Sequence, residues 1–256
     1  MGKAALGLLT VLICGGALAQ ESGEHSGPVE WKSWQAHTDI ANKASLQRGA
    51  RNFVNYCLGC HSLQYMRYNR LAADLGLTEE QLTSNFMFSG GRPFDIMKTA
   101  MPSADSANWF GKTPPDLTLI ARARGTDYLY QFLKTFYLDP ERPTGVNNLA
   151  LENVAMPAVL ADLQGTQKAV FVLEKKNEGN GEQMVRVFDH FEQAAPGRMS
   201  AAEFDDFVRD TVNFLDYVGE PVREKRESLG LWVVLFLLVF TGFAWALKKE
   251  VWKDVH

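Results

Sequence analysis

The chain has 256 residues, a formal net charge of −4 at pH 7 and only three cysteines. The chain has 26 basic and 30 acidic residues, of which four basic and two acidic ones lie outside residues 20–228. Residues 20–228 therefore hold 22 basic and 28 acidic residues and have a net charge of −6. A domain this acidic is expected to repel nucleic acid and to favour a basic partner, although ordinary solubility charge would explain the same balance. About two hundred residues can bury one sizeable hydrophobic core.

Residues 1–19 have the features of a secretory signal peptide. Lys3 gives a positive start, an apolar run follows, and "ALA" at 17–19 fits a small-residue cleavage site. An uncleaved anchor helix is the alternative, but the run is short and is interrupted by Gly15 and Gly16. Cys14 would leave with the signal, and residues 20–228 would be exported to the periplasm.

The next feature along the chain is the sequence "CLGCH" at 57–61, which holds the other two cysteines. A disulfide between neighbours this close would constrain little of the unfolded chain. A thioredoxin-like redox pair needs a β-α-β setting, and the residues before Cys57 show a helical pattern instead. A zinc site needs four ligands, and no second cluster of cysteine and histidine exists in the sequence.

A fourth interpretation uses all three residues of this motif. In C-x-x-C-H, two thiols add across the vinyl groups of a haem and the adjacent imidazole ligates the iron. One turn of helix spaces the two sulfurs and brings the histidine over one face of the porphyrin. The motif therefore predicts one covalently bound haem c, attached at Cys57 and Cys60, with His61 as the proximal iron ligand.

A helix is expected to lead into this motif, because Leu46, Ala50, Phe53 and Cys57 recur at spacings of four, three and four. A second helix is expected near the end of the domain. Its capping box is Ser200 with Glu203, its end is marked by Gly219 and Pro221, and its apolar stripe is Phe204, Phe207, Val208, Thr211, Leu215 and Val218. Two such helices packed across each other are typical of small c-type cytochromes, but also of other α-rich domains.

Two methionines are candidates for the sixth ligand of the iron. Met101 and Met156 both occur in the sequence "AMP", where proline stiffens the loop beside the ligand. A methionine ligand would close the iron to substrates and raise its potential. Met101, forty residues after His61, is credible by spacing, and the residue pattern alone does not separate the two.

Residues 168–192 alternate apolar residues around "NEGNG" and predict a β-hairpin. This hairpin could be a decoration, a contact with a partner, or a lid beside the haem, and decoration is the default.

Residues 229–247 carry no charge and are about long enough to cross the ~30 Å hydrocarbon core as a helix. Charged residues flank the segment, and tryptophans suit its two interfaces: Trp232, Trp245 and Trp252. A buried core helix is the alternative. Export of the body would leave the lysines of residues 248–256 on the cytoplasmic side of a bacterial inner membrane, as the positive-inside rule expects.

Four segments resemble the cytochrome c1 family, the haem subunit of the cytochrome bc1 (ubiquinol–cytochrome c oxidoreductase) complex. They are "LQRGARNFVNYCLGCHSLQYMRYNRL", "KTPPDLTLIARARGTDYLYQFL", "PTGVNNLALENVAMPAVL" and "FLDYVGEPVREKRESLG", in this order over nearly the whole mature chain. The resemblance implies Met156 as the iron ligand, with Met101 as runner-up. It also implies that Arg124 and Tyr128 lie near a haem propionate and that Pro114 and Pro115 shape the wall of the pocket.

The fold implied is mainly α: a c-type cytochrome domain with loop and β-hairpin insertions and one C-terminal transmembrane helix. By resemblance, the chain would pass one electron from the Rieske iron–sulfur protein to a soluble c-type cytochrome, beside cytochrome b in a dimeric complex. It would make and break no substrate bond itself. The alternatives are another membrane-tethered c-type cytochrome, serving a terminal oxidase or reductase, and a membrane-tethered thiol–disulfide oxidoreductase.

Overall fold

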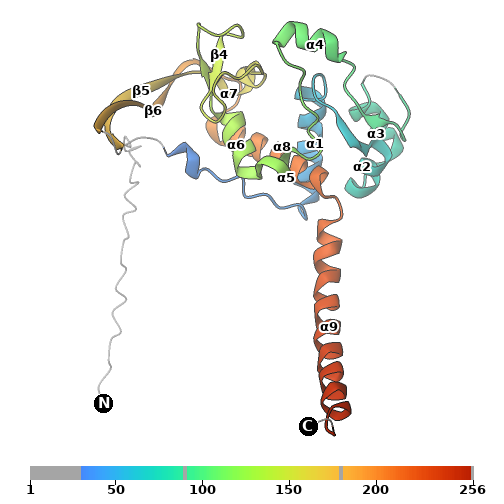
Figure 1. Cartoon of the computed structure of the whole chain (residues 1–256). Coiled ribbons are helices and arrows are strands. Elements are labelled where there is room, and N and C mark those ends of the chain that lie inside the picture. The colour runs from blue at the N-terminus through green and yellow to red at the C-terminus, as the bar shows by residue number, and fades with distance from the viewer. Residues whose placement is uncertain (1–29, 89–90, 179–180, 255–256) are drawn as a thin grey trace, which may run out of the picture.

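The computed structural model describes residues 30–88, 91–178 and 181–254 and shows a mainly helical head above one long C-terminal helix (Figure 1). The predicted signal peptide lies outside the described residues. The helices are η1 (Trp31–Ser33), α1 (Lys43–Tyr56), α2 (Tyr68–Leu75), α3 (Glu79–Phe86), α4 (Ser103–Phe110), α5 (Ile120–Arg124), α6 (Thr126–Lys134), α7 (Ala161–Gln164), α8 (Ala201–Gly219) and α9 (Arg223–Val251).

The strands form antiparallel pairs rather than one continuous sheet. Within the described residues the pairs are β1 (Leu63–Arg67) with β2 (Ile96–Met97), β3 (Phe136–Leu138) with β4 (Val146–Asn148), and β5 (Gly165–Glu178) with β6 (Gly181–Pro196). The predicted hairpin is therefore confirmed and is longer than expected. It projects from one end of the head, opposite α2 and α3 (Figure 1).

The core of the head is the contact between α1 and α8, the two helices expected from the sequence. Leu46, Ala50 and Phe53 of α1 are buried as predicted, and the Phe53 ring lies 5.7 Å from that of Phe214 in α8. The helices approach so closely at Gly49 that a Cβ there would overlap the backbone carbonyl of Asp210. Apolar burial and this close approach together fix how α1 enters the Cys57 turn.

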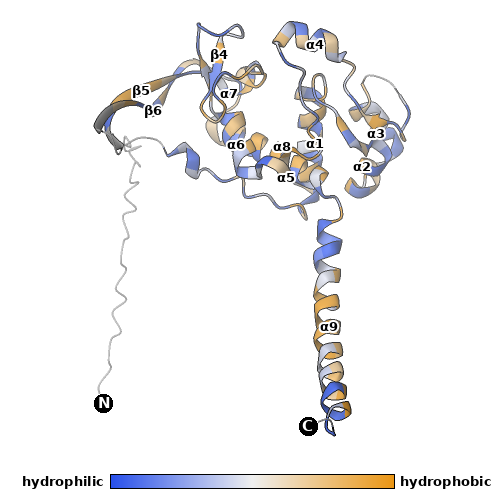
Figure 2. Ribbon diagram, viewed as in Figure 1, coloured by the Kyte–Doolittle hydropathy of each residue, from blue (hydrophilic) through white to orange (hydrophobic). Residues whose placement is uncertain are grey.

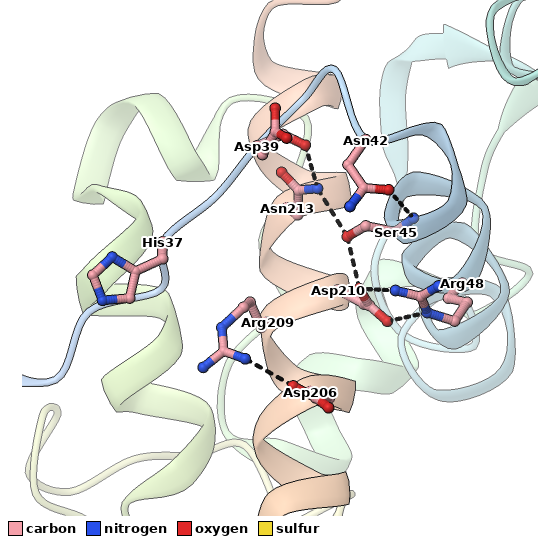
Figure 3. Close-up of a pocket in the computed structure, with 9 residues that line it drawn as sticks. All are labelled: His37, Asp39, Asn42, Ser45, Arg48, Asp206, Arg209, Asp210 and Asn213. Carbon is pink, nitrogen blue, oxygen red and sulfur yellow. Dashed lines mark hydrogen bonds and ion pairs between the residues drawn. The ribbon is translucent and has the colours of Figure 1, made fainter. Parts of the chain in front are cut away.

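Helix α8 is buried on more sides than its apolar stripe predicts, because polar residues on its other face bond to the first half of α1 and to Asp39 just before that helix. Asp210 accepts hydrogen bonds from Ser45 Oγ at 2.6 Å and from Arg48 Nη2 at 2.9 Å. Asn213 Nδ2 donates to the Asp39 carbonyl at 2.8 Å and to Ser45 Oγ at 2.9 Å (Figure 3). These hydrogen bonds pair buried polar groups of α8 and hold the segment before α1 against α1 and α8.

Helix α9 is a single 29-residue helix with a mean hydropathy of 2.2 in its most apolar window. None of that window is buried against the head, which argues against the buried core helix considered above. Its length of about 43 Å exceeds the hydrocarbon core of a bilayer, so both charged ends can reach water. Figure 2 shows the apolar band between two hydrophilic ends. The expected long apolar C-terminal helix is confirmed.

Candidate functional site

The C-x-x-C-H sequence forms one tight turn directly after α1. Cys57 ends the helix with its N–H bonded to the Phe53 carbonyl at 2.8 Å. The Cys57 carbonyl then accepts from the N–H of Cys60 at 3.0 Å and from the N–H of His61 at 2.8 Å. This turn places both thiols and the imidazole at the same end of α1, held by the packing of that helix on α8.

The His61 ring is oriented by a backbone carbonyl 54 residues further along the chain. Its Nδ1 lies 2.7 Å from the Pro115 oxygen. A carbonyl oxygen can only accept, so Nδ1 carries the proton and Nε2 presents its lone pair. Burial lowers the pKa of His61, against the opposing effects of Pro115 and Asp116, and this favours the neutral ring. A neutral imidazole with one nitrogen free and the other bonded to a carbonyl suits metal ligation.

The segment that carries Pro115 is fastened to the residues after His61. The N–H of Leu117 bonds to the Ser62 carbonyl at 3.0 Å, and the N–H of Gln64 bonds to Asp116 Oδ2 at 2.9 Å. The other Asp116 oxygen caps the turn by accepting from the N–H of Thr118 at 2.9 Å. The proline pair was predicted to shape the pocket wall. No residue pattern in the sequence indicates the bonds of Asp116.

The two thiols are partly buried and form no disulfide. Burial and, to a smaller extent, the charge of Cys60 raise the pKa of Cys57 to about 12, and burial also raises the pKa of Cys60. Thiol–disulfide exchange needs an accessible thiolate, and its enzymes lower the pKa of the attacking cysteine. Helix α1 also precedes the motif where that chemistry expects a strand. Both observations disfavour the thiol–disulfide oxidoreductase.

A zinc site would need several ligand side chains close together among the described residues. No group of three or more cysteine, histidine, aspartate or glutamate side chains with metal-binding geometry occurs among them. The cleft around residues 37–48 and 206–213 (Figure 3) is a separate feature, because it lies at the start of α1 whereas Cys57 follows its end. Along α1, the lining residue nearest to Cys57 is Arg48, which precedes it by about 14 Å of helix.

Hydrogen bonds of Thr99 link the backbone of Met101 to the C-x-x-C-H turn. The Thr99 hydroxyl donates to the Gly59 carbonyl at 2.7 Å, and the same oxygen accepts from the N–H of Met101 at 3.1 Å. Met101 itself is partly buried. The structure therefore joins the loop that holds the runner-up ligand to the turn that carries the cysteines.

Met156 lies in the loop between β4 and α7 and is also partly buried. The loop is held by two asparagines that the sequence analysis did not single out. Asn147 Oδ1 accepts from the N–H of Asn153 at 2.9 Å, and Asn148 Oδ1 accepts from the N–H groups of Ala150 and Leu151 at 2.9 and 3.1 Å. Both asparagines are almost fully buried, with 3% and 1% exposure, so this loop has a defined course.

Arg124 and Tyr128, the two residues that the resemblance places near a haem propionate, lie beside each other. Arg124 ends α5 and Tyr128 lies in the first turns of α6, with the guanidinium carbon 5.6 Å from the centre of the ring. Gly125, with a φ of 87°, makes the bend between the two helices. No carboxylate of the described residues pairs with Arg124. This guanidinium can therefore accept a carboxylate from a bound group.

These residues fit a covalently bound haem. Two thiols stand at the required spacing, the imidazole has one nitrogen free, and an unpaired guanidinium lies beside a phenol. A haem supplies one-electron redox chemistry when bound. The chain's own residues would attach it, orient the ligating ring and neutralise its carboxylates.

The comparisons with known proteins concern the whole chain. The model of the Cytochrome C1 family matches residues 31–255. Cytochrome c1 of Allochromatium vinosum is 47% identical over 256 residues, covering 100% of both chains. The ammonia monooxygenase gamma subunit of Nitrosomonas europaea is 44% identical over 232 residues, 91% of this chain and 92% of that protein. Cytochrome b/c1 of Bradyrhizobium diazoefficiens is 25% identical over 297 residues, 100% of this chain and 41% of that protein.

The family model matches nearly all the residues after the predicted signal, and one relative is 47% identical over its full length. The chain belongs to the cytochrome c1 family, whose members carry haem c and are subunits of the cytochrome bc1 complex.

Proposed function

We propose that this chain relays one electron from a Rieske iron–sulfur protein to a soluble c-type cytochrome during quinol oxidation. Quinol oxidation itself would take place in the neighbouring cytochrome b. The observation that carries the proposal is the turn at Cys57–His61, where both thiols adjoin an imidazole held by Pro115 with Nε2 free. No substrate bond is made or broken by the chain.

The proposal gives each candidate residue one role. Cys57 and Cys60 attach a single haem c, and His61 ligates its iron. Met156 is the second axial ligand, with Met101 as runner-up, and its thioether favours the ferrous state and closes the iron to substrates. Arg124 and Tyr128 hold a haem propionate by charge and by a hydrogen bond.

The surroundings of the head follow from its anchor and its charge. With α9 in the bacterial inner membrane, the head lies in the periplasm, the end of the chain is cytoplasmic, and the complex is a dimer. The acidic body, with a net charge of −6 over residues 20–228, attracts a basic electron acceptor and makes association dependent on salt. One relative is a single polypeptide named cytochrome b/c1, which supports cytochrome b as the neighbour.

Purification in mild detergent tests the assembly. We expect a tagged full-length chain to bring down a b-type haem and a Rieske iron–sulfur centre, both visible by optical and electron paramagnetic resonance spectroscopy. The head truncated before α9 is the matched control and should lose these partners. A preparation with neither centre would contradict the bc1 role. It would favour another c-type cytochrome or, if monooxygenase subunits appeared, an assembly like the one named for the Nitrosomonas relative.

A further inference from the structure

The connection between the head and the membrane helix is three residues long. Helix α8 ends at Gly219 and α9 begins at Arg223, and Glu220, Pro221 and Val222 lie between them. Two backbone hydrogen bonds span it: Glu220 N–H bonds to the Tyr217 carbonyl and Arg223 N–H to the Glu220 carbonyl, both at 3.1 Å. Proline fixes one φ angle of this short link. Its backbone therefore has little freedom of its own.

Glu220 bridges the two sides of this connection. Its carboxylate accepts from Arg226 Nε of α9 at 2.6 Å and from Arg226 Nη2 at 3.4 Å. The same carboxylate lies 3.6 Å from Nη1 of Arg122, which belongs to α5. Its side chain is only 18% exposed, whereas both arginines are 58% exposed. Glu220 is thus the shared and better protected partner of one arginine from the anchor and one from the head.

Asp216, a carboxylate one turn earlier on α8, also pairs with an arginine of the anchor helix. Asp216 of α8 is 7% exposed and receives Nη1 and Nη2 of Arg223 at 2.9 and 3.1 Å. It also accepts from the Thr38 hydroxyl of the N-terminal segment at 2.9 Å. A bidentate pair this well shielded from water fixes the rotation of the first turn of α9 about its axis.

The contact of Glu220 with Arg122 leads directly to the candidate haem site. Arg122 lies in the chain segment that begins with Pro115, the partner of His61, and ends with Arg124. This segment packs against the end of α8 so closely that a Cβ at Gly219 would come within 3.1 Å of Arg122 Cγ. One continuous stretch thus bonds to the imidazole through Pro115 and, through Arg122, pairs with Glu220 in the link that precedes the membrane anchor.

We propose that Glu220 is a positioning residue that locks the orientation of the haem-binding head on its membrane helix, through Arg226 on the anchor and Arg122 on the head. The inference rests on the proposed electron relay. Electron transfer between fixed centres falls steeply with their separation, so a head free to tilt would spend time at distances unsuited to its membrane-bound donor. The lock keeps the haem at one height and one angle above the bilayer.

Distances between the head and the far end of α9 test this lock. Gadolinium labels at Glu79→Cys in α3 and Lys248→Cys in α9 occupy exposed positions on the two parts. Their distance distribution would be measured by double electron–electron resonance on the full-length haem-loaded protein in lipid nanodiscs. We expect one narrow distribution for the parent, and a distribution about twofold broader or with a second maximum after Glu220→Gln. Arg226→Gln and Arg122→Gln should broaden it as well.

Glu224→Gln is the matched control, because Glu224 is an exposed acid in the first turn of the same helix. It should leave the distribution unchanged. The absorption spectrum of the haem should be unchanged in every variant, since none of these side chains is a proposed ligand. An unchanged distribution in Glu220→Gln, or equal broadening in Glu224→Gln, would overturn the proposal. The measurement involves no electron transfer, so it succeeds or fails independently of the proposed relay.

Discussion

Replacing Met156 with leucine is expected to abolish the sulfur-to-iron charge-transfer band of the oxidised protein and to lower its midpoint potential by on the order of a hundred millivolts. Leucine matches methionine in volume, so the loop between β4 and α7 keeps its packing. The buried Asn147 and Asn148 that hold this loop are untouched. The change therefore removes the thioether and little else. Optical spectroscopy and redox titration of the membrane fraction measure both effects.

Met101→Leu is the matched control for this prediction. It makes the same chemical change in the other "AMP" segment, whose backbone is joined to the Cys57–His61 turn through Thr99. We expect the charge-transfer band to persist and the potential to move little. Loss of the band in Met101→Leu, with its retention in Met156→Leu, would exchange the two ligand assignments while leaving the family membership intact.

The second large effect is expected from Gly49→Ala in α1. A Cβ at this position would overlap the Asp210 carbonyl of α8 and would also come within 2.7 Å of Phe214 Cβ. Both obstacles belong to a helix that is itself buried, so neither can move aside cheaply. Overpacking commonly costs about 1–3 kcal/mol, and a clash with a backbone atom should cost at least about 3 kcal/mol. This is a large share of the roughly 5–15 kcal/mol that holds a domain folded.

Arg51→Ala provides the control, because it lies half a turn further along α1 and its side chain is exposed. Its effect on the free energy of unfolding should stay within about 0.5 kcal/mol. Thermal unfolding followed by circular dichroism compares the two variants. A melting temperature for Gly49→Ala equal to that of Arg51→Ala would show that α1 and α8 do not pack as closely as the structure has them.

The sequence predicted those elements whose residues repeat with a clear period. The apolar spacing from Leu46 to Phe53 gave α1, the Ser200–Glu203 capping box gave the start of α8, and alternation gave the β5–β6 hairpin. In each case the local pattern and the buried face agree, so tertiary packing reinforces what the local sequence favours.

Elements held by contacts between distant residues could not be predicted in the same way. Asp210 and Asn213 on the polar side of α8 look like solvent-facing residues, yet both are buried: Asp210 bonds to Ser45 of α1, and Asn213 bonds to Asp39 in the segment before α1. The spacing of residues along one helix does not reveal a contact with residues more than a hundred positions away in the sequence. The same holds for the carboxylate of Glu220, whose partner Arg122 lies far away in the sequence.

The candidate site shows the same division. The adjacent residues Cys57, Cys60 and His61 carry their chemistry in a five-residue motif, and the sequence was enough to propose them. The carbonyl that orients the imidazole belongs to Pro115. Every residue has a backbone carbonyl, so the residue pattern does not show which one bonds to His61. The propionate role of Arg124 and Tyr128 came from resemblance alone and stays a prediction, and the structure adds that the guanidinium lies 5.6 Å from the centre of the ring.

The central claim is that a haem is bound covalently at Cys57 and Cys60. Its most direct test is the pyridine haemochrome spectrum of the purified full-length protein after extraction with acidified acetone. The account predicts that one equivalent of haem stays with the polypeptide and shows the spectrum of a haem linked by two thioethers. A colourless polypeptide whose two cysteines both react with an alkylating reagent would contradict it.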